Sequence, residues 1–290
     1  MQNVLRVNFT NRMKIAELLQ KGTSFLHERK TGLLESEVLL AYVLGVGREY
    51  LFAHSEDLVD GDLVALYEKY LDRVSDGEPL AYITGEKEFY GLNFYVDKRV
   101  LIPRPETEAL VEEVLKYLDG GSGKVLDVAT GSGCIAVSVA KGCDECEVLA
   151  LDLSEDALDV ARLNVEQHGV EDRVQLAISD LLDVIDEHEE FDVIVANLPY
   201  IGEVRNRFVD AATFDYEPKM ALFGGEGGLE LYEKMFLELS GKNIKFGLLV
   251  GEFGFGQSDE MAALLNRFFV DRWQIVKDLA GIERMFVVRG

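Results

Sequence analysis

Apolar and polar positions divide the chain into a part with helical periodicity and a longer part with strands. Before residue 85, apolar residues recur three or four positions apart in KIAELLQKGTSFLHERK, ESEVLLAYVLGV and LVALYEKYLDRVSDG. This spacing predicts amphipathic helices, which glycines and aspartates separate. No stretch of this part has the pattern of a strand. We therefore expect residues 1–84 to form a small helical domain.

The pattern changes at residue 85. KEFYGLNFYVD carries aromatic residues on both sides of Gly91, which predicts a β-hairpin within a linker of residues 85–103. Two prolines then interrupt the chain. The second one suits the first position of a helix, and two glutamates suit its positive N-terminal end. PETEALVEEVLKYL is therefore expected to be a helix.

Strand patterns fill the rest of the chain. The candidates are KVLDVAT, EVLALDL, RVQLAIS, FDVIVAN, KFGLLVGEF, WQIVKDL and RMFVVR. The first five are nearly continuously apolar, as parallel strands covered on both faces are. Helical segments separate the early strands, and Ser154 suits the N-cap of SEDALDVARLNVEQHG. Only AGIE lies between the last two strands, so they are expected to pair antiparallel.

These segments predict an α/β fold with a seven-stranded, mostly parallel sheet that ends in an antiparallel C-terminal hairpin. That outline resembles the Rossmann-like fold of class I S-adenosylmethionine-dependent methyltransferases. The resemblance implies a methyltransferase domain over residues 104–290, after the helical domain and the linking hairpin.

Composition and charge limit the expected location of the chain and the classes of molecule that it is expected to bind. The chain has 290 residues, of which 48% are hydrophobic, and no apolar run long enough for a transmembrane helix. The start has no continuous apolar core, so no secretory signal is expected and the expected location is cytoplasmic, without a membrane. The 53 acidic residues outnumber the 29 basic ones, giving a net charge of −24. Direct nucleic-acid binding is therefore not expected, because it depends on lysine and arginine at phosphates.

Two of the three cysteines form a CxxC, Cys143 to Cys146. A zinc site needs four ligands, and no second CxxC or pair of histidines accompanies this one. A redox CxxC usually opens a helix after a strand, whereas this one follows a helix. We expect two reduced thiols in a loop, and no metal site.

The first strand runs into a glycine loop, LDVATGSGCIAVSVA, in which Gly131 and Gly133 allow a tight turn close to a ligand. Ligands of open α/β sheets bind beyond the carboxyl ends of the strands. Asp152 ends the second strand. Counted from Gly133 of the glycine loop, it lies close to the roughly 20 residues at which an acid is expected to bind ribose hydroxyls. Asp180 ends the third strand and is expected to accept from an adenine amino group. An adenosyl ligand is therefore predicted.

NAD is the competing ligand. Its G-x-G-x-x-G pattern is absent, and the loop fits Asp-x-Gly-x-Gly-x-Gly better, with Asp127 first. Ala129 replaces the first glycine of that pattern. If position 129 needs a positive φ, alanine costs roughly 1–2 kcal/mol there.

The fourth strand ends in Asn197-Leu198-Pro199-Tyr200. This resembles the (Asn/Asp/Ser)-Pro-Pro-(Tyr/Phe) motif of methyltransferases that act on planar amide or exocyclic amino nitrogens. Such a nitrogen gains positive charge on attack, so the site needs acceptors fixed at its N–H groups. The Asn197 side-chain oxygen and the Leu198 carbonyl are the candidates, and Tyr200 offers a flat face. Leu198 replaces the first proline of the motif, and only ring rigidity is expected to be lost.

Further segments narrow the substrate. GEKEFYGLNFYVDKRVLIPRPETE and EPKMALFGGEGGLELY are similar to signatures of the HemK/PrmC family of release-factor glutamine N5-methyltransferases, as is the order of helical domain, hairpin and methyltransferase domain. The resemblance implies S-adenosylmethionine as cofactor, and the glutamine of the Gly-Gly-Gln loop in class 1 release factors as substrate.

The resemblance and the strand ends together give a set of site residues. Helix capping accounts for Pro105 and the two glutamates of RPETE but not for Arg104 and Thr107, which are free to wall the substrate pocket. Glu217 is expected in a flexible loop on the substrate side. Leu181 stands where some family members contact the cofactor with an aromatic ring. Expected cofactor residues are Asp127, Ala129, Thr130, Gly131, Ser132, Gly133, Asp152, Asp180, Leu181 and Asn197; expected substrate residues are Asn197, Leu198, Pro199 and Tyr200, which are also the catalytic ones, with Arg104, Thr107 and Glu217.

Two alternatives stay open. Asn-Leu-Pro-Tyr also occurs in rRNA adenine dimethyltransferases, so an N6-adenine nucleic-acid methyltransferase is one, and the charge and the hairpin segment count against it. A non-catalytic S-adenosylmethionine-binding protein is the other, and the departures at Ala129 and Leu198 favour it.

Overall fold

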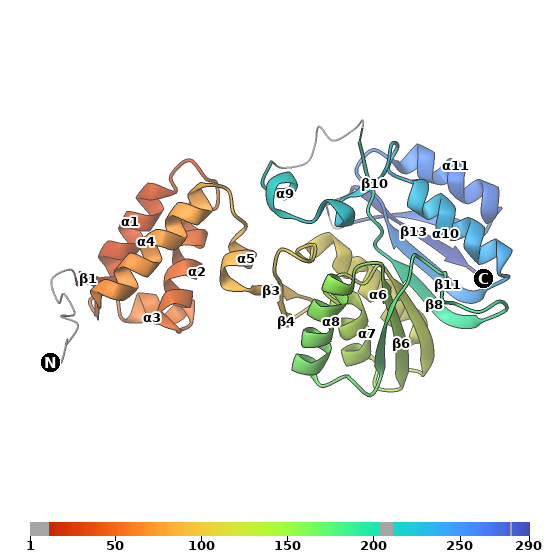
Figure 1. Ribbon diagram of the computed structural model, residues 1–290, viewed down its shortest axis with the longest axis horizontal. Helices are drawn as coiled ribbons and strands as arrows, with labels where there is room; N and C mark the ends of the chain where they lie inside the picture. The colour runs from red at the N-terminus through yellow and green to blue at the C-terminus, as the bar shows by residue number, and fades with distance from the viewer. Residues whose placement is uncertain (1–11, 204–210, 279) are drawn as a thin grey trace, which may run out of the picture. The chain divides into compact units, whose positions relative to one another are not determined.

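A computed structural model describes residues 12–203, 211–278 and 280–290. The chain divides into two compact units between Gly85 and Glu86 (Figure 1). Residues 1–11 of the expected helical domain lie outside the described residues. None of the described helices is both long and apolar enough to span a bilayer.

The first unit is built from helices around one apolar core. Tyr67, Leu18 and Leu39 are fully buried in it, and the Tyr67 hydroxyl lies 2.7 Å from Ser36 Oγ. One strand pair was not expected: β1 (Met13–Lys14) pairs antiparallel with β2 (Leu58–Val59). Two residues are too few to show an alternating pattern. The helices are α1 (Ile15–Phe25), α2 (Gly32–Leu44), α3 (Arg48–Ala53), α4 (Gly61–Ser75) and α5 (Leu80–Thr84).

The second unit opens with the expected hairpin, β3 (Glu86–Phe89) and β4 (Leu92–Tyr95). Its turn places Tyr90 and Gly91 at φ 52° and 73°, the left-handed region that both central residues of a type I′ hairpin turn require. The expected helix follows as η1 (Pro105–Thr107) and α6 (Glu108–Leu118). Pro105 stands at its first turn, where a missing N–H costs nothing.

All seven expected strands form one sheet, in the order β12-β13-β11-β8-β5-β6-β7. The last two pair antiparallel as expected, and β13 also runs antiparallel to β11. The first strand, β5, is central, and the chain returns to β8 on its other side after β6 and β7. The space between β5 and β8 is therefore a topological switch point, where ligands of such sheets bind. The strands are β5 (Gly123–Val128), β6 (Cys146–Asp152), β7 (Val174–Ile178), β8 (Glu190–Ala196), β11 (Lys245–Glu252), β12 (Trp273–Lys277) and β13 (Glu283–Arg289).

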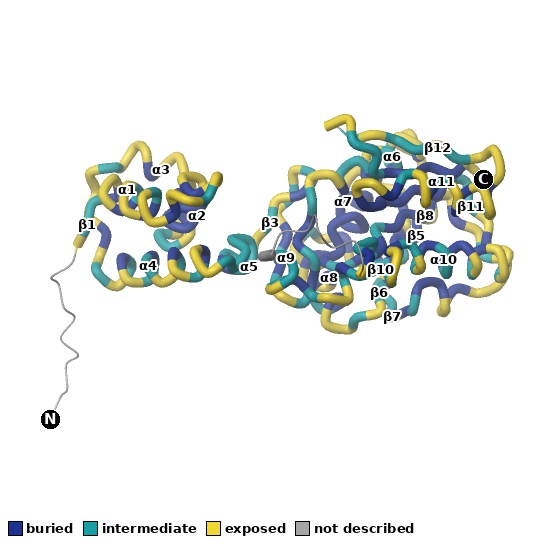
Figure 2. The backbone as a smooth tube through the Cα atoms, turned by 90° about the horizontal axis from the view of Figure 1, so that it is seen from above, coloured by how far each residue is buried: buried dark blue, intermediate teal, exposed yellow. Residues whose placement is uncertain are grey.

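Helices cover both faces of this sheet. On β5 and β8, Val125 and Val193 belong to the apolar core shared with α6 and α7, while Leu126 and Ile194 belong to the core under α10 and α11. Figure 2 shows these central strands as mostly buried. Ser154 caps α8 as expected, accepting from the Ala157 N–H at 3.2 Å. The remaining elements are α7 (Cys134–Gly142), α8 (Glu155–His168), β9 (Ile201–Gly202), α9 (Ala211–Tyr216), η3 (Lys219–Ala221), β10 (Phe223–Gly225), α10 (Glu230–Gly241) and α11 (Ser258–Phe268).

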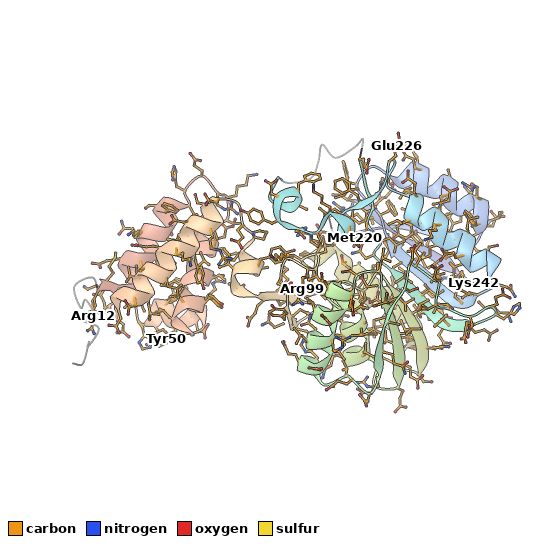
Figure 3. The ribbon with its side chains drawn as sticks, in the orientation of Figure 1. Arg12, Tyr50, Arg99, Met220, Glu226 and Lys242 are labelled. Carbon is orange, nitrogen blue, oxygen red and sulfur yellow. A yellow bond between two sulfur atoms is a disulfide. The ribbon has the colours of Figure 1, made fainter. Side chains whose placement is uncertain are left out.

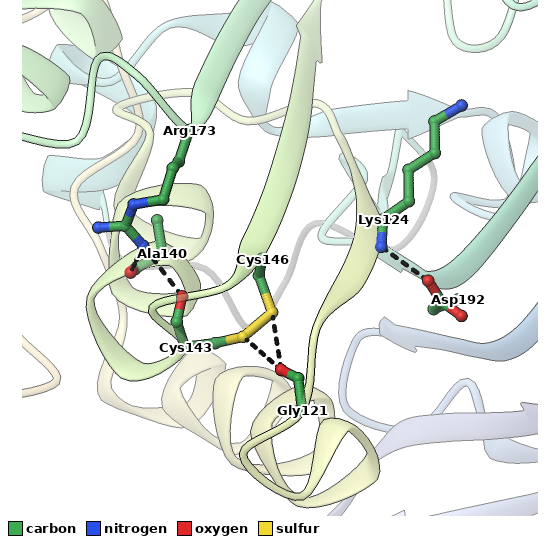
Figure 4. Close-up of a disulfide and its surroundings, with 7 residues drawn as sticks. All are labelled: Gly121, Lys124, Ala140, Cys143, Cys146, Arg173 and Asp192. Atoms are coloured by element: carbon green, nitrogen blue, oxygen red, sulfur yellow. Dashed lines mark hydrogen bonds between the residues drawn. A yellow bond between two sulfur atoms is a disulfide. The ribbon is translucent and has the colours of Figure 1, made fainter.

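Cys143 and Cys146 form a disulfide in the turn between α7 and β6 (Figure 4). The expectation of two reduced loop thiols is therefore wrong. The turn brings the two Cα atoms to 5.5 Å, within the range that a disulfide spans. Both sulfur atoms lie near the Gly121 carbonyl oxygen, at 3.1 Å and 3.7 Å. The bond stands at the amino end of β6, at the opposite edge of the sheet from the strand ends that carry the expected site.

Candidate functional site

A cavity of about 460 Å³ lies in the second unit beyond the carboxyl ends of β5 to β8. It spans the switch point between β5 and β8. Many of the expected site residues line it: Thr107, Ala129, Thr130, Gly131, Ser132, Asp152, Asp180, Leu181, Asn197, Leu198 and Pro199. Five others are not among its lining residues: Arg104, Asp127, Gly133, Tyr200 and Glu217.

Three residues of the loop after β5 adopt the left-handed backbone conformation. Ala129, Gly131 and Gly133 have φ angles of 62°, 57° and 79°. A Cβ at Gly133 would lie 3.2 Å from the Ala161 Cβ on α8, whereas a Cβ at Gly131 would meet nothing within 4 Å. Gly133 therefore lets the loop pack on α8, and Gly131 leaves open space on the cavity side. Ala129 is the non-glycine residue at a position that favours glycine.

Asp127 lies beneath this loop. Its Oδ2 accepts a hydrogen bond of 2.6 Å from the Thr130 hydroxyl, while its Oδ1 is buried without a partner. Burial is the main reason that the pKa of Asp127 rises to about 7, and the nearby Asp152 adds to the shift. Asp127 therefore shapes the loop from below rather than from within the cavity.

Asp152 ends β6 and joins two segments. Its Oδ2 accepts from the Gly131 backbone N–H and its Oδ1 from the Ser154 N–H, both at 2.9 Å. Burial raises the pKa of Asp152. A carboxylate offers about four acceptor positions, so about two remain for a ligand at the cavity.

The end of β7 supplies Asp180 and Leu181. Lys234 Nζ on α10 lies 2.6 Å from Asp180 Oδ2, in an ion pair whose two side chains are half-exposed. Asp180 is thus already paired with a cation. Leu181 is buried, with a φ of 52°, and presents an aliphatic surface to the cavity.

Asn197 follows β8 and is tied to the segment before α6. Its Nδ2 donates to Thr107 Oγ1 at 3.1 Å, and the Thr107 hydroxyl donates to Glu252 Oε2 at 2.7 Å. The Tyr200 hydroxyl donates to the other oxygen of Glu252 at 2.9 Å. Burial raises the pKa of Glu252, which is 3% exposed. Glu252 joins Asn197 and Tyr200 into one polar network, and the sequence did not indicate it.

Leu198 does more than replace a proline. Its side chain is 1% exposed and belongs to the core under α10 and α11. Its backbone N–H, which a proline would lack, points to the Tyr232 hydroxyl at 3.4 Å. The expectation that only ring rigidity separates leucine from proline here is therefore wrong.

A wall of the cavity comes from residues 98–103, none of which was among the expected site residues. Arg99 from this segment and Met220 from η3 both line the cavity and are labelled in Figure 3. Glu217 anchors the segment. Its Oε2 accepts from the Ile102 N–H at 3.0 Å, and its Oε1 pairs with Arg104 at 2.5 Å. Glu217 is 5% exposed, so it is a buried anchor rather than the residue of a flexible loop.

Comparison with known families matches both units. Residues 17–85 match the PrmC N-terminal domain, and residues 105–216 match the Methyltransferase small domain. The chain is 40% identical over 285 residues to a release factor glutamine methyltransferase of Clostridium acetobutylicum, with 96% of this chain and 99% of that protein covered. It is 38% identical over 257 residues to one of Koribacter versatilis, with 88% of this chain and 90% of that protein covered.

Solved structures share the fold. The hMettl16 catalytic domain in complex with MAT2A 3'UTR hairpin 6 gives a TM-score of 0.57 at 14% identity, covering 81% of this chain and 84% of that chain. The T. Thermophilus 16S rRNA N2 G1207 methyltransferase in complex with AdoMet and guanosine gives 0.51 at 17% identity, covering 71% of this chain and 50% of that one. At these identities the likeness concerns the fold alone.

Proposed function

This chain belongs to the family of release factor glutamine methyltransferases, and on that premise we propose that it methylates the side-chain nitrogen N5 of a release-factor glutamine. The cofactor would be S-adenosylmethionine, and the glutamine that of the Gly-Gly-Gln motif in class 1 peptide-chain release factors. The observation that carries the proposal is Asn197, which lines the cavity and is held there by a hydrogen bond to Thr107.

The residues around the cavity fit an adenosyl cofactor. Asp152 keeps acceptor positions free for ribose hydroxyls beside the glycine loop, and Gly131 leaves room there for a bulky group. Asp180 and Leu181 line the side where an adenine would lie. A volume of about 460 Å³ is within the range of cofactor sites.

S-adenosylmethionine supplies an electrophilic methyl group when it is bound. The chain's own residues then have to hold an amide nitrogen in line with that methyl. Asn197 Oδ1 and the Leu198 carbonyl oxygen are the two acceptors for the amide N–H groups. They stabilise the positive charge that the nitrogen gains on attack, which is worth most when the acceptors are fixed beforehand.

No strong base is needed, because a methylated and protonated amide loses its proton readily to water. The rate then comes from positioning and electrostatics, and the rigid network behind Asn197 suits that task. Tyr200 is held by the same network through Glu252. We assign Tyr200 to the substrate side, although it does not line the cavity.

The first unit is assigned to recognition of the release factor. Every residue given to the cofactor lies in the second unit, which has its own core. The match of residues 17–85 to the PrmC N-terminal domain supports a specialised role for the first unit.

Methyl transfer from labelled S-adenosylmethionine to a release factor, a duplex DNA and a ribosomal RNA, measured side by side, tests the proposal. Label in the release factor, on the glutamine of its Gly-Gly-Gln peptide, is expected. Label in either nucleic acid without label in the release factor would replace the proposal with an adenine methyltransferase. Binding of the cofactor without transfer to any of the three would indicate a non-catalytic protein.

A further inference from the structure

In the polar network behind Asn197, each hydrogen bond has a defined donor and acceptor. Glu252 accepts at both of its oxygens, from Thr107 at 2.7 Å and from Tyr200 at 2.9 Å. A hydroxyl has one hydrogen to donate. Because Thr107 gives that hydrogen to Glu252, its oxygen can only accept from the side chain on its other side, which is Asn197.

This direction selects one of the two orientations of the Asn197 amide. An oxygen facing Thr107 would meet lone pairs, whereas Nδ2 donates to Thr107 Oγ1 at 3.1 Å. With Nδ2 turned to Thr107, Oδ1 is left as the terminal atom that can accept from a ligand in the cavity. Thr107 is 1% exposed and Glu252 is 3% exposed, so water does not compete for the bond that fixes the Thr107 hydrogen on Glu252.

We infer that Thr107 and Glu252 are positioning residues that keep the Asn197 amide turned with its oxygen towards the substrate nitrogen. The inference rests on the proposed function, since it assigns the reason for the network to amide methylation. Thr107 and Glu252 act only through Asn197 in this role, and neither supplies an acceptor to the substrate itself.

The closest test is a substitution that makes the orientation irrelevant. In Asn197→Asp both terminal atoms accept, so either orientation presents an oxygen. Thr107→Val should lower the kcat for release-factor methylation by about 5- to 10-fold in the chain with Asn197. The reason is that the Asn197 side chain loses the hydrogen bond that both sets its orientation and restrains it. In the Asn197→Asp chain, which is slower to begin with, Thr107→Val should change kcat by less than about 2-fold.

Two comparisons separate this role from simple support of the fold. Thr107→Ser keeps the hydroxyl and should stay within about 2-fold of the unchanged chain, and KM for the release factor should move less than kcat for Thr107→Val. Glu252→Leu should lose less activity in the Asn197→Asp chain than with Asn197. Its contact with Tyr200 is lost equally in both backgrounds.

An equal loss of kcat for Thr107→Val in both backgrounds would overturn the inference, since support of the fold does not depend on the atoms of residue 197. A wild-type kcat for Thr107→Val would also overturn the inference. This measurement is informative even if the Asn197→Asp chain shows no methyl transfer. Failure of the unchanged chain to methylate any release factor is a different result, and it would end the proposed function itself.

Discussion

Asp152 accepts a hydrogen bond of 2.9 Å from the Gly131 backbone N–H. The bond joins the end of β6 to the loop after β5. The carboxylate assigned to the ribose is therefore also a support of the glycine loop, and the second Asp152 oxygen holds the start of α8 through Ser154. Binding and local stability are coupled at this residue.

Asp152→Ala should weaken binding of S-adenosylhomocysteine at least about 10-fold and lower the free energy of unfolding by roughly 1–3 kcal/mol, because two partly buried N–H groups lose their acceptor. Asp152→Asn keeps one acceptor oxygen and should lose less ligand affinity and less stability than Asp152→Ala. Calorimetry with the ligand and urea unfolding measure the two effects. Unchanged affinity in Asp152→Ala would remove Asp152 from the cofactor site.

The sequence predicted those features that depend on neighbouring positions. The seven strands were predicted because burial on both faces leaves continuous apolar runs, and the hairpin because Gly91 suits a tight turn. Glu252 was not predicted, since its role depends on Thr107, which is 145 residues away along the chain. Glu217 is similar: a polar residue in a glycine-rich stretch gave no sign that it would be buried against Ile102 and Arg104.

Ala129→Gly should stabilise the chain by about 0.5–1 kcal/mol. Alanine at a φ of 62° costs roughly 1–2 kcal/mol, and glycine gives back part of that gain through the entropy of the unfolded state. Urea unfolding at neutral pH measures the difference. A destabilised Ala129→Gly chain would mean that the Ala129 methyl group contributes more by packing than its backbone conformation costs.

Asp127→Asn should stabilise the chain above neutral pH. The pKa of Asp127 is raised from 3.8 to about 7, so between these values the folded chain keeps a proton that the unfolded chain has lost. In the wild-type chain, the contribution of Asp127 to the free energy of unfolding therefore falls as pH rises from about 4 to about 7, and it stays low at higher pH. Asparagine carries no charge at any of these pH values.

The measurement is urea unfolding of both chains across this pH range. The advantage of Asp127→Asn should grow with pH by roughly 2–4 kcal/mol and then level off. A difference between the two chains that does not change with pH would contradict the assigned protonation of Asp127.

A chain that starts at Gly85 should bind S-adenosylhomocysteine with wild-type affinity and fail to methylate intact release factor. The cavity and both cores that support its strands belong to the second unit. Ligand binding by calorimetry serves as the control that the shortened chain is folded. Full transfer to the release factor by this chain would show that residues 1–84 are not needed for recognition.

Asn197→Ala tests the amide clamp most directly. The measurement is single-turnover methylation of a release factor, with the modified glutamine identified by mass spectrometry of the Gly-Gly-Gln peptide. The rate should fall by roughly 10²–10³, as when one preorganised polar group is removed from a centre that develops charge. S-adenosylhomocysteine binding and thermal unfolding should report a folded chain. Methylation of that glutamine by Asn197→Ala at the wild-type rate would contradict the mechanism.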